Sequence, residues 1–309
     1  MKTNLARFVF FSLVLFALSP YSSSALALLA GIILASTLGN PFPEFTKKHT
    51  STLLQYSVVG LGAGMNLKVV GVVGAQGVGY TITGIALTAL VGYGLAKLLK
   101  TPNILSTLIT VGTAICGGSA IAATGPIIKA EHEDMSVSLG VVFILNACAL
   151  FIFPPIGHYL GLTQHQFGIW SALAIHDTSS VVGASMQYGA EALELATTVK
   201  LARALWIIPI SLLFAFFMKS KSKIKMPWFI FGFILVAALV TWVPALSEVG
   251  HQVSRIAKQL LVLTLFFIGI NLNLDSIKRV GIKPLLLGFI LWVVVATTTV
   301  MALKLNWII

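Results

Sequence analysis

Apolar stretches long enough to cross a lipid bilayer recur from one end of this sequence to the other, and this recurrence limits the fold most. Of the 309 residues, 57% are hydrophobic and only 9% are charged, with a mean hydropathy of +0.97. An ordinary soluble domain has about 25% charged residues. No polar segment between the apolar stretches is long enough to form a separate folded domain. The sequence therefore predicts a single all-α, polytopic membrane domain over residues 1–309.

Turn-forming and charged residues divide the apolar sequence into eleven predicted transmembrane segments. Their first residues lie near Phe8, Leu26, Thr52, Gln76, Ile104, Ser136, Phe167, Ala204, Trp228, Gln259 and Pro284. The runs from Phe8 and Leu26 are shorter than the roughly 20 residues that a straight span needs, so we expect their ends to include Ser, Pro or Thr.

The net charge of +11 is interpreted as a topology signal, because no basic patch interleaved with aromatic residues indicates nucleic-acid binding. With a cytoplasmic N-terminus and eleven crossings, the basic residues on the inside are Lys2, Arg7, Lys47, Lys48, Lys97, Lys100, Lys219, Lys221, Lys223, Lys225, Lys278, Arg279 and Lys283. Those on the outside are Lys68, Lys129, Lys200, Arg203, Arg255, Lys258 and Lys304, together with the acids Glu131, Glu133, Asp134, Glu191, Glu194 and Glu248. The positive-inside rule thus predicts a cytoplasmic N-terminus and a periplasmic C-terminus. The run from Lys219 to Lys225 contributes most, and contact with lipid headgroups is compatible with the same side.

The first 27 residues also resemble a secretory signal, which is an alternative to a first span. Lys2 and Arg7 precede an apolar run from Phe8 to Leu18, and Ala25-Leu26-Ala27 is a small-residue cleavage pattern. Cleavage would leave ten spans without changing the sidedness of the rest.

A short motif occurs twice, as Gly64-Met65-Asn66-Leu67 and as Gly269-Ile270-Asn271-Leu272. Each copy ends an apolar run and precedes another predicted span. The predicted topology places the first copy outside and the second inside, as an inverted repeat would. The alternative is two unrelated asparagine caps at helix ends.

Two predicted spans contain small, polar, helix-breaking clusters near their middle. These are the stretches 113–126, with Cys116-Gly117-Gly118-Ser119, and 173–184, with His176-Asp177-Thr178-Ser179-Ser180. Such clusters indicate interrupted helices, whose free backbone groups must be buried in protein or line a wet cavity. Close helix packing through small residues is the alternative interpretation.

Asp177 is the only acidic residue placed deep in a predicted span, and a lone carboxylate there costs several kcal/mol unless it is paired, solvated or protonated. It is therefore the first functional candidate, for coupling to a proton or sodium ion. His176 precedes it and titrates near neutral pH in its unperturbed state. An N-cap on a half-helix beginning at Thr178 is the structural alternative for Asp177, and both roles can coexist.

Helices that restart after the two clusters would direct their free N–H groups and positive ends at a cavity suited to an anion. The predicted substrate-binding residues are Cys116, Gly117, Gly118, Ser119, Thr178, Ser179, Ser180, Asn66 and Asn271. Because Asp177 would repel an anion, the sequence predicts that it is protonated or holds a cation. We expect no cofactor beyond this coupling ion.

Enzyme classes find little support in the sequence. Intramembrane aspartyl proteolysis needs two carboxylates, and the histidines outside the second cluster show no metal-ligand spacing. There is no HExxH, GxSxG or P-loop motif. Cys116 and Cys148 lie in apolar segments, where a packing role is expected. We therefore expect no catalytic residues, no metal site and no self-contained ATP-driven pump.

The stretch CGGSAIAATGPIIKA from Cys116, Asn146 in the next span, and AIHDTSSVVGA from Ala174 through TTVKLARALWIIP carry a family resemblance. They are similar to the YeiH-like family of uncharacterised bacterial inner-membrane proteins, whose members are named as sulfate exporters. That family is grouped with the bile acid, arsenite and riboflavin transporter superfamily. The resemblance implies transport, inverted repeats and crossed, interrupted helices, and it places Cys116–Ala120 and His176–Ser180 at the family's most characteristic positions.

The leading hypothesis is a secondary transporter of a small anion in the inner membrane, such as sulfate, sulfite or a sulfonate. A cation or proton antiporter in which Asp177 binds the transported ion is the first alternative, and a channel or membrane receptor is the second. The expected partners are the anionic solute and membrane lipids, with no nucleic acid. Glycine-rich spans fit packing within one chain or between two copies, so the sequence is compatible with a monomer and with a homodimer.

Overall fold

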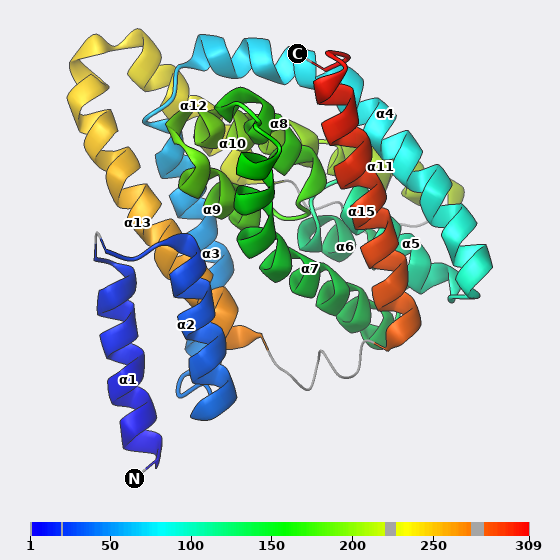
Figure 1. Ribbon diagram of the computed structural model, residues 1–309, viewed down its shortest axis with the longest axis horizontal. Coiled ribbons are helices and arrows are strands. Elements are labelled where there is room, and N and C mark those ends of the chain that lie inside the picture. Colours follow the sequence, from blue (N-terminus) through cyan, green and yellow to red (C-terminus); the bar gives the residue numbers. More distant parts are fainter. Residues whose placement is uncertain (1, 20, 220–226, 273–280, 309) are drawn as a thin grey trace. The chain divides into compact units, whose positions relative to one another are not determined.

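The computed structural model describes residues 2–19, 21–219, 227–272 and 281–308, and within them every regular element is a helix (Figure 1). The first half contains α1 (Lys2–Ala17), α2 (Ser24–Thr37), α3 (Pro43–Gly62), α4 (Leu67–Leu99), α5 (Asn103–Ala114), α6 (Gly118–Thr124) and α7 (His132–Tyr159). The second half contains α8 (Gln164–Ala174), α9 (Thr178–Tyr188), α10 (Ala190–Ala204), α11 (Ile207–Phe217), α12 (Trp228–Trp242), the 3₁₀ turn η1 (Pro244–Leu246), α13 (Ser247–Asn271) and α15 (Ile282–Lys304).

Each predicted segment overlaps one helix or one pair of consecutive helices, which confirms the all-α class. Agreement is loosest at α10 and α13, which begin at Ala190 and Ser247, well before the predicted starts at Ala204 and Gln259. In both places charged residues lower the local hydropathy without ending the helix.

Five helical stretches in the described part of the chain are long and apolar enough to cross a membrane. They are Val78–Leu99, His132–Tyr159, Ala190–Phe217, Pro244–Asn271 and Ile282–Lys304. Only 17% of the most apolar window in Val78–Leu99 is buried within the chain, so its remaining apolar surface requires lipid or another chain. Shorter apolar helices account for other predicted segments, so eleven crossings remain a prediction.

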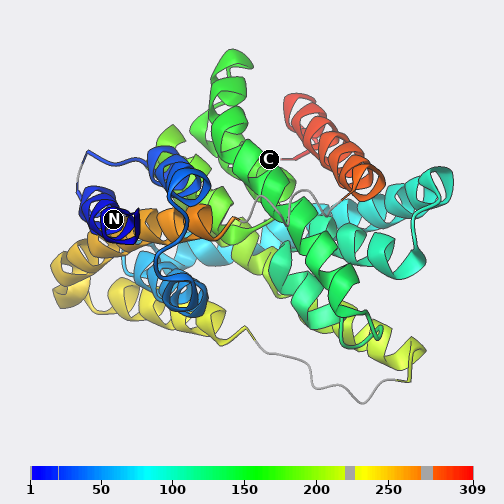
Figure 2. The ribbon, with the colours of Figure 1, turned by 90° about the horizontal axis from the view of Figure 1, so that it is seen from below.

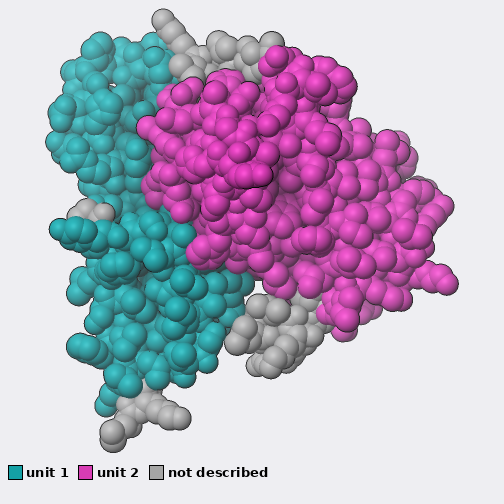
Figure 3. All heavy atoms as spheres, in the orientation of Figure 1, with its two compact units in different colours: residues 1–72, 227–274 teal, residues 73–226, 275–309 magenta. Residues whose placement is uncertain are grey.

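The chain forms two compact units, each built from two separate stretches of sequence (Figure 3). Unit 1 comprises Met1–Val72 and Pro227–Leu274, and unit 2 comprises Val73–Met226 and Asp275–Ile309. Neither unit is one continuous segment, so no linker in the sequence separates them. The predicted single domain remains a prediction.

Unit 1 is held together by close packing of α13 against α2 and α3, which run alongside it in two views (Figures 1 and 2). A Cβ atom on Gly31 of α2 would lie 2.4 Å from the Phe266 carbonyl oxygen of α13. A Cβ atom on Gly269 of α13 would lie 2.2 Å from the Leu28 carbonyl oxygen. The two glycines therefore allow a backbone approach that any larger residue would prevent.

In unit 2, α10 packs against α8 and α9, while α7 packs against α5, α6 and α9. The helix α15 contacts α5, α7 and α8. Together these helices enclose the two segments in which the sequence predicts interrupted helices.

Part of the predicted topology signal lies outside the described residues. This applies to Lys221, Lys223 and Lys225 of the basic run and to Lys278 and Arg279. The sidedness of the chain and the cleavage of its first 27 residues remain predictions.

Candidate functional site

The first helix interruption lies between α5 and α6, as the sequence predicts. The helix α5 ends at Ala114, and α6 begins at Gly118. Gly117 between them has φ +65°, a conformation that strains residues with a side chain. A Cβ atom on Gly117 would also lie 3.0 Å from Val142 Cγ1 and 3.4 Å from Asp177 Cβ. Glycine is therefore required both for the turn and for the approach of the second interruption.

The second interruption lies between α8 and α9, and Asp177 is the N-cap of α9. The Ser180 backbone N–H donates to Asp177 Oδ1 at 2.8 Å, and the Ser179 hydroxyl donates to Oδ2 at 2.9 Å. The capping role predicted for Asp177 is confirmed. Both carboxylate oxygens have protein donors, and the residue is half-buried.

Asn146 of α7 fixes the second interruption from the side. Its Oδ1 accepts hydrogen bonds from the backbone N–H groups of His176 at 3.1 Å and Asp177 at 3.3 Å. Its Nδ2 and both ring nitrogens of His176 are buried and find no partner among the described residues. An unpaired buried polar group costs about 1–3 kcal/mol, so these atoms favour a water molecule or solute as partner.

Lys200 of α10 is fully buried, at 0% exposure, and binds the ends of both interrupted helices. Its ammonium group donates to the carbonyl oxygens of Ile175 at 2.6 Å, Ala172 at 3.3 Å and Ile115 at 3.4 Å. Three acceptors match the three N–H bonds of a protonated ammonium group, whereas a neutral amine has two.

Arg203 lies one turn further along α10 at 1% exposure. Its guanidinium group donates to the carbonyl oxygens of Ala114 at 2.8 Å and Thr113 at 3.2 Å in α5, and to that of Leu173 in α8. These carbonyls belong to the last turns of the two helices, where free C=O groups carry partial negative charge. Lys200 and Arg203 thus neutralise both helix ends.

The predicted topology, which places Lys200 and Arg203 outside the membrane before a span that starts at Ala204, is wrong at this point. The apolar helical stretch runs over Ala190–Phe217 and includes both residues. Their spacing by three residues inside a long apolar stretch is the signal that identifies them, because such residues face the same side of a helix. Even without Lys200 and Arg203, the predicted topology places more basic residues on the cytoplasmic side of the membrane than on the outside.

Nine of the eleven predicted site residues, 116–119 and 176–180, lie in unit 2. We call residues 115–117 and 175–177, with Asn146, Lys200 and Arg203, the break site, and it contains four of the predicted residues: Cys116, Gly117, His176 and Asp177. Cys116, His176, Ser179 and Ser180 are buried, Gly118 and Thr178 are half-buried, and Ser119 is exposed. Cys116 is buried, as a packing role predicts, whereas Cys148 is exposed, and both are free. No group of three metal-ligating side chains lies together within the described ranges.

Asn66 and Asn271 belong to unit 1. Asn271 Oδ1 accepts from Thr46 Oγ1 at 2.7 Å and from Asn40 Nδ2 at 3.1 Å, and its Nδ2 donates to Thr50 Oγ1 at 3.3 Å. Asn66 directly precedes α4, whereas Asn271 is the last residue of α13. The two asparagines thus occupy different positions relative to their helices, and the inverted repeat remains a prediction.

The fold and the break site define a polytopic helical membrane protein with two interrupted helices that meet. The family model "Conserved hypothetical protein 698" matches residues 8–288, and the chain belongs to this family. It is similar to a UPF0324 membrane protein of Bdellovibrio bacteriovorus, at 56% identity over 99% of this chain and 97% of the relative. A UPF0324 membrane protein of Geobacter sulfurreducens is 47% identical over 99% and 98%, respectively. One of Bacteroides thetaiotaomicron is 51% identical over 91% and 86%. No solved structure matches the chain.

Proposed function

We propose that the chain is a secondary transporter of a small anion and that the anion binds at the break site. The observation that carries this proposal is the meeting of two helix interruptions, where Gly117 approaches Asp177. Backbone that leaves a helix at membrane depth is tolerated where it is buried in protein or lines a cavity. The unpaired buried nitrogens of Asn146 and His176 supply polar groups that a bound solute would satisfy.

The charge balance supports an anion over a cation. When both are protonated, Lys200 and Arg203 contribute two positive charges, and Asp177 contributes one negative charge. The helix ends at Ala114 and Ala174 carry partial negative charge, but the two cations donate to their carbonyls. The α9 N-terminus adds partial positive charge next to Asp177. The site as a whole is therefore positive.

Asp177 is the proposed coupling residue. Its carboxylate would disfavour an anion until it is neutralised by a proton or paired with a sodium ion, so that anion and cation bind together. The proposed substrate is a sulfur oxyanion or a sulfonate, which follows the family resemblance. The proposal places the chain in the bacterial inner membrane with a cytoplasmic N-terminus, and it assigns no enzymatic step or cofactor.

The test is transport by the purified protein in proteoliposomes. Uptake of labelled sulfate, sulfite, thiosulfate and small sulfonates is measured under an imposed proton or sodium gradient. We expect saturable uptake of one anion class that depends on one of the two gradients. In Asp177→Asn this gradient dependence should be lost, because the amide keeps the cap but carries no charge.

Glu191→Gln is the matched control, since it removes a carboxylate from an exposed position at the start of α10. It should keep the coupling of the parent protein. Gradient-dependent anion uptake that survives in Asp177→Asn would refute the coupling role. Sodium or proton exchange without any anion movement would instead identify a cation antiporter.

A further inference from the structure

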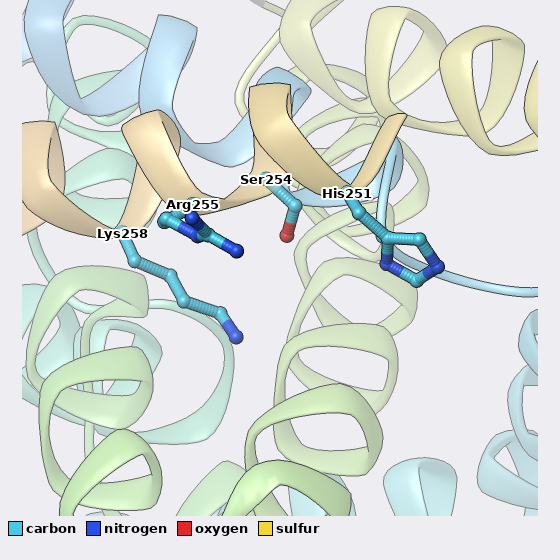
Figure 4. A pocket seen from close by; sticks show the side chains of 5 residues that line it. His251, Ser254, Arg255 and Lys258 are labelled. Atoms are coloured by element: carbon cyan, nitrogen blue, oxygen red, sulfur yellow. The ribbon is translucent and has the colours of Figure 1, made fainter. Parts of the chain in front are cut away.

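A second group of basic residues lines a pocket in unit 1. The pocket has a volume of about 310 Å³ and is lined by Gly64, His251, Ser254, Arg255 and Lys258. The last four residues lie on the first half of α13 at spacings of three and four, which places them on one face of the helix. Figure 4 shows their side chains leaving α13 on the same side.

The donors of this pocket are unused within the described part of the chain. Among the described residues, no hydrogen bond or ion pair engages the side chains of His251, Ser254, Arg255 or Lys258. No acidic residue with a described position lines the pocket, and Glu248 lies one turn before His251 without contributing to it. The two positive charges of Arg255 and Lys258 on one helix face repel one another, so this arrangement favours a bound anion.

Gly64 gives the pocket its shape at Ser254. A Cβ atom on Gly64 would lie 2.5 Å from Ser254 Oγ, closer than real Cβ contacts allow. Ser254 is 8% exposed, so its hydroxyl lies at the base of the pocket, while His251 and Arg255 are exposed. A hydroxyl below the two cations Arg255 and Lys258 is a donor set suited to the oxygens of a tetrahedral oxyanion.

We propose that His251, Ser254, Arg255 and Lys258 form a binding site for a phosphate- or sulfate-type oxyanion. Arg255 supplies a planar pair of N–H donors, Lys258 supplies a compact charge, and Ser254 supplies a hydroxyl donor. The pocket volume is near the lower end of the range that accepts small organic ligands, so an oxyanion that carries a substituent also fits. This site belongs to unit 1 and does not depend on the proposed transport function.

The same oxyanion chemistry has two sources, a free ion and the headgroup of an anionic phospholipid, and the experiment separates them. The full-length protein is purified in detergent with lipid removed, and its thermal unfolding is recorded with inorganic phosphate, with sulfate, and with chloride at matched ionic strength. A second series uses short-chain phosphatidylglycerol and phosphatidylcholine of the same chain length. A ligand that binds only the folded state raises the unfolding temperature.

We expect phosphate or sulfate, or phosphatidylglycerol, to raise the unfolding temperature above its chloride or phosphatidylcholine control. In Arg255→Gln and Lys258→Gln the affinity should fall roughly tenfold or more each, because each variant loses a charge-assisted hydrogen bond. Lys48→Gln, which removes an exposed cation from α3 in the same unit, should keep the full shift. A shift with the free ions identifies a soluble ligand, and a shift with phosphatidylglycerol alone identifies a lipid.

The proposal is overturned if neither series stabilises the parent protein beyond its control. It is equally overturned if the shift is unchanged in both pocket variants, because the ligand then binds elsewhere. Ser254→Ala is an additional small variant, and it should weaken binding without removing any charge.

Discussion

The two groups of basic residues in this chain differ in what their donors bind. Lys200 and Arg203 in unit 2 are buried, and carbonyl oxygens of the helix ends accept their hydrogen bonds. Arg255 and Lys258 in unit 1 line an open pocket and have no partner among the described residues. The first pair therefore stabilises the fold at an interruption, whereas the second is available to a ligand.

This difference shows that a charged residue on an apolar helix can either stabilise the fold or be available to a ligand. Both pairs are three residues apart in a helical stretch that is long and apolar enough to span a membrane. What distinguishes them is whether neighbouring backbone leaves acceptors unpaired. Helix interruption creates such acceptors at residues 113–115 and 172–175, and none of the donors in the unit 1 pocket meets one.

The largest effect is expected from Arg203→Ala. This variant leaves the carbonyls of Thr113, Ala114 and Leu173 without their donor at buried positions. We expect a loss of stability on the order of 3–5 kcal/mol, measured as a lower unfolding temperature and a lower yield of folded protein. Arg255→Ala is the matched control. If both arginine variants behaved alike, the structural role of Arg203 would be wrong.

A smaller loss is expected from Lys200→Met, which keeps the length and apolar body of the side chain. Three carbonyls lose a donor, but two of these contacts are 3.3 Å and 3.4 Å long, and the desolvation cost of a buried charge is also removed. We expect a loss of about 2 kcal/mol by thermal unfolding. A variant more stable than the parent protein would show that the charge is not needed at this position.

The cap of α9 should contribute less again. Asp177→Ala removes the acceptor for the Ser180 N–H group and should cost about 1 kcal/mol, while Asp177→Asn should be nearly neutral because Asn caps equally well. Thermal unfolding of both variants separates the cap from the charge. An equal loss in both variants would mean that the negative charge itself holds the break site together.

The smallest effect is expected from Arg255→Gln without any added ligand. Its side chain has no partner to lose among the described residues, so stability should change by no more than about 0.5 kcal/mol. The measurement is thermal unfolding of delipidated protein in chloride buffer. A large loss would assign Arg255 a structural contact and make the two pairs alike.

Much of the break site could be predicted from the sequence, because helix-breaking residues act locally. Gly117 and Asp177 mark the interruptions, since glycine allows positive φ and aspartate caps a helix. Both effects are local and do not depend on how the rest of the chain packs. Asn146 is one of the residues that carry the family resemblance, but its contact with the second interruption depends on the packing of α7 against α9, which no local pattern predicts.

By itself the sequence determined a helical membrane protein and the positions where two of its helices stop, since hydrophobic length and local capping act within one segment. Only the tertiary structure decided that Lys200 and Arg203 bind both helix ends and that Asn271 lies in a different unit from the break site. The reason is physical. A donor on α10 and an acceptor on α5 are far apart in the chain, and only packing decides which free donor meets which free carbonyl.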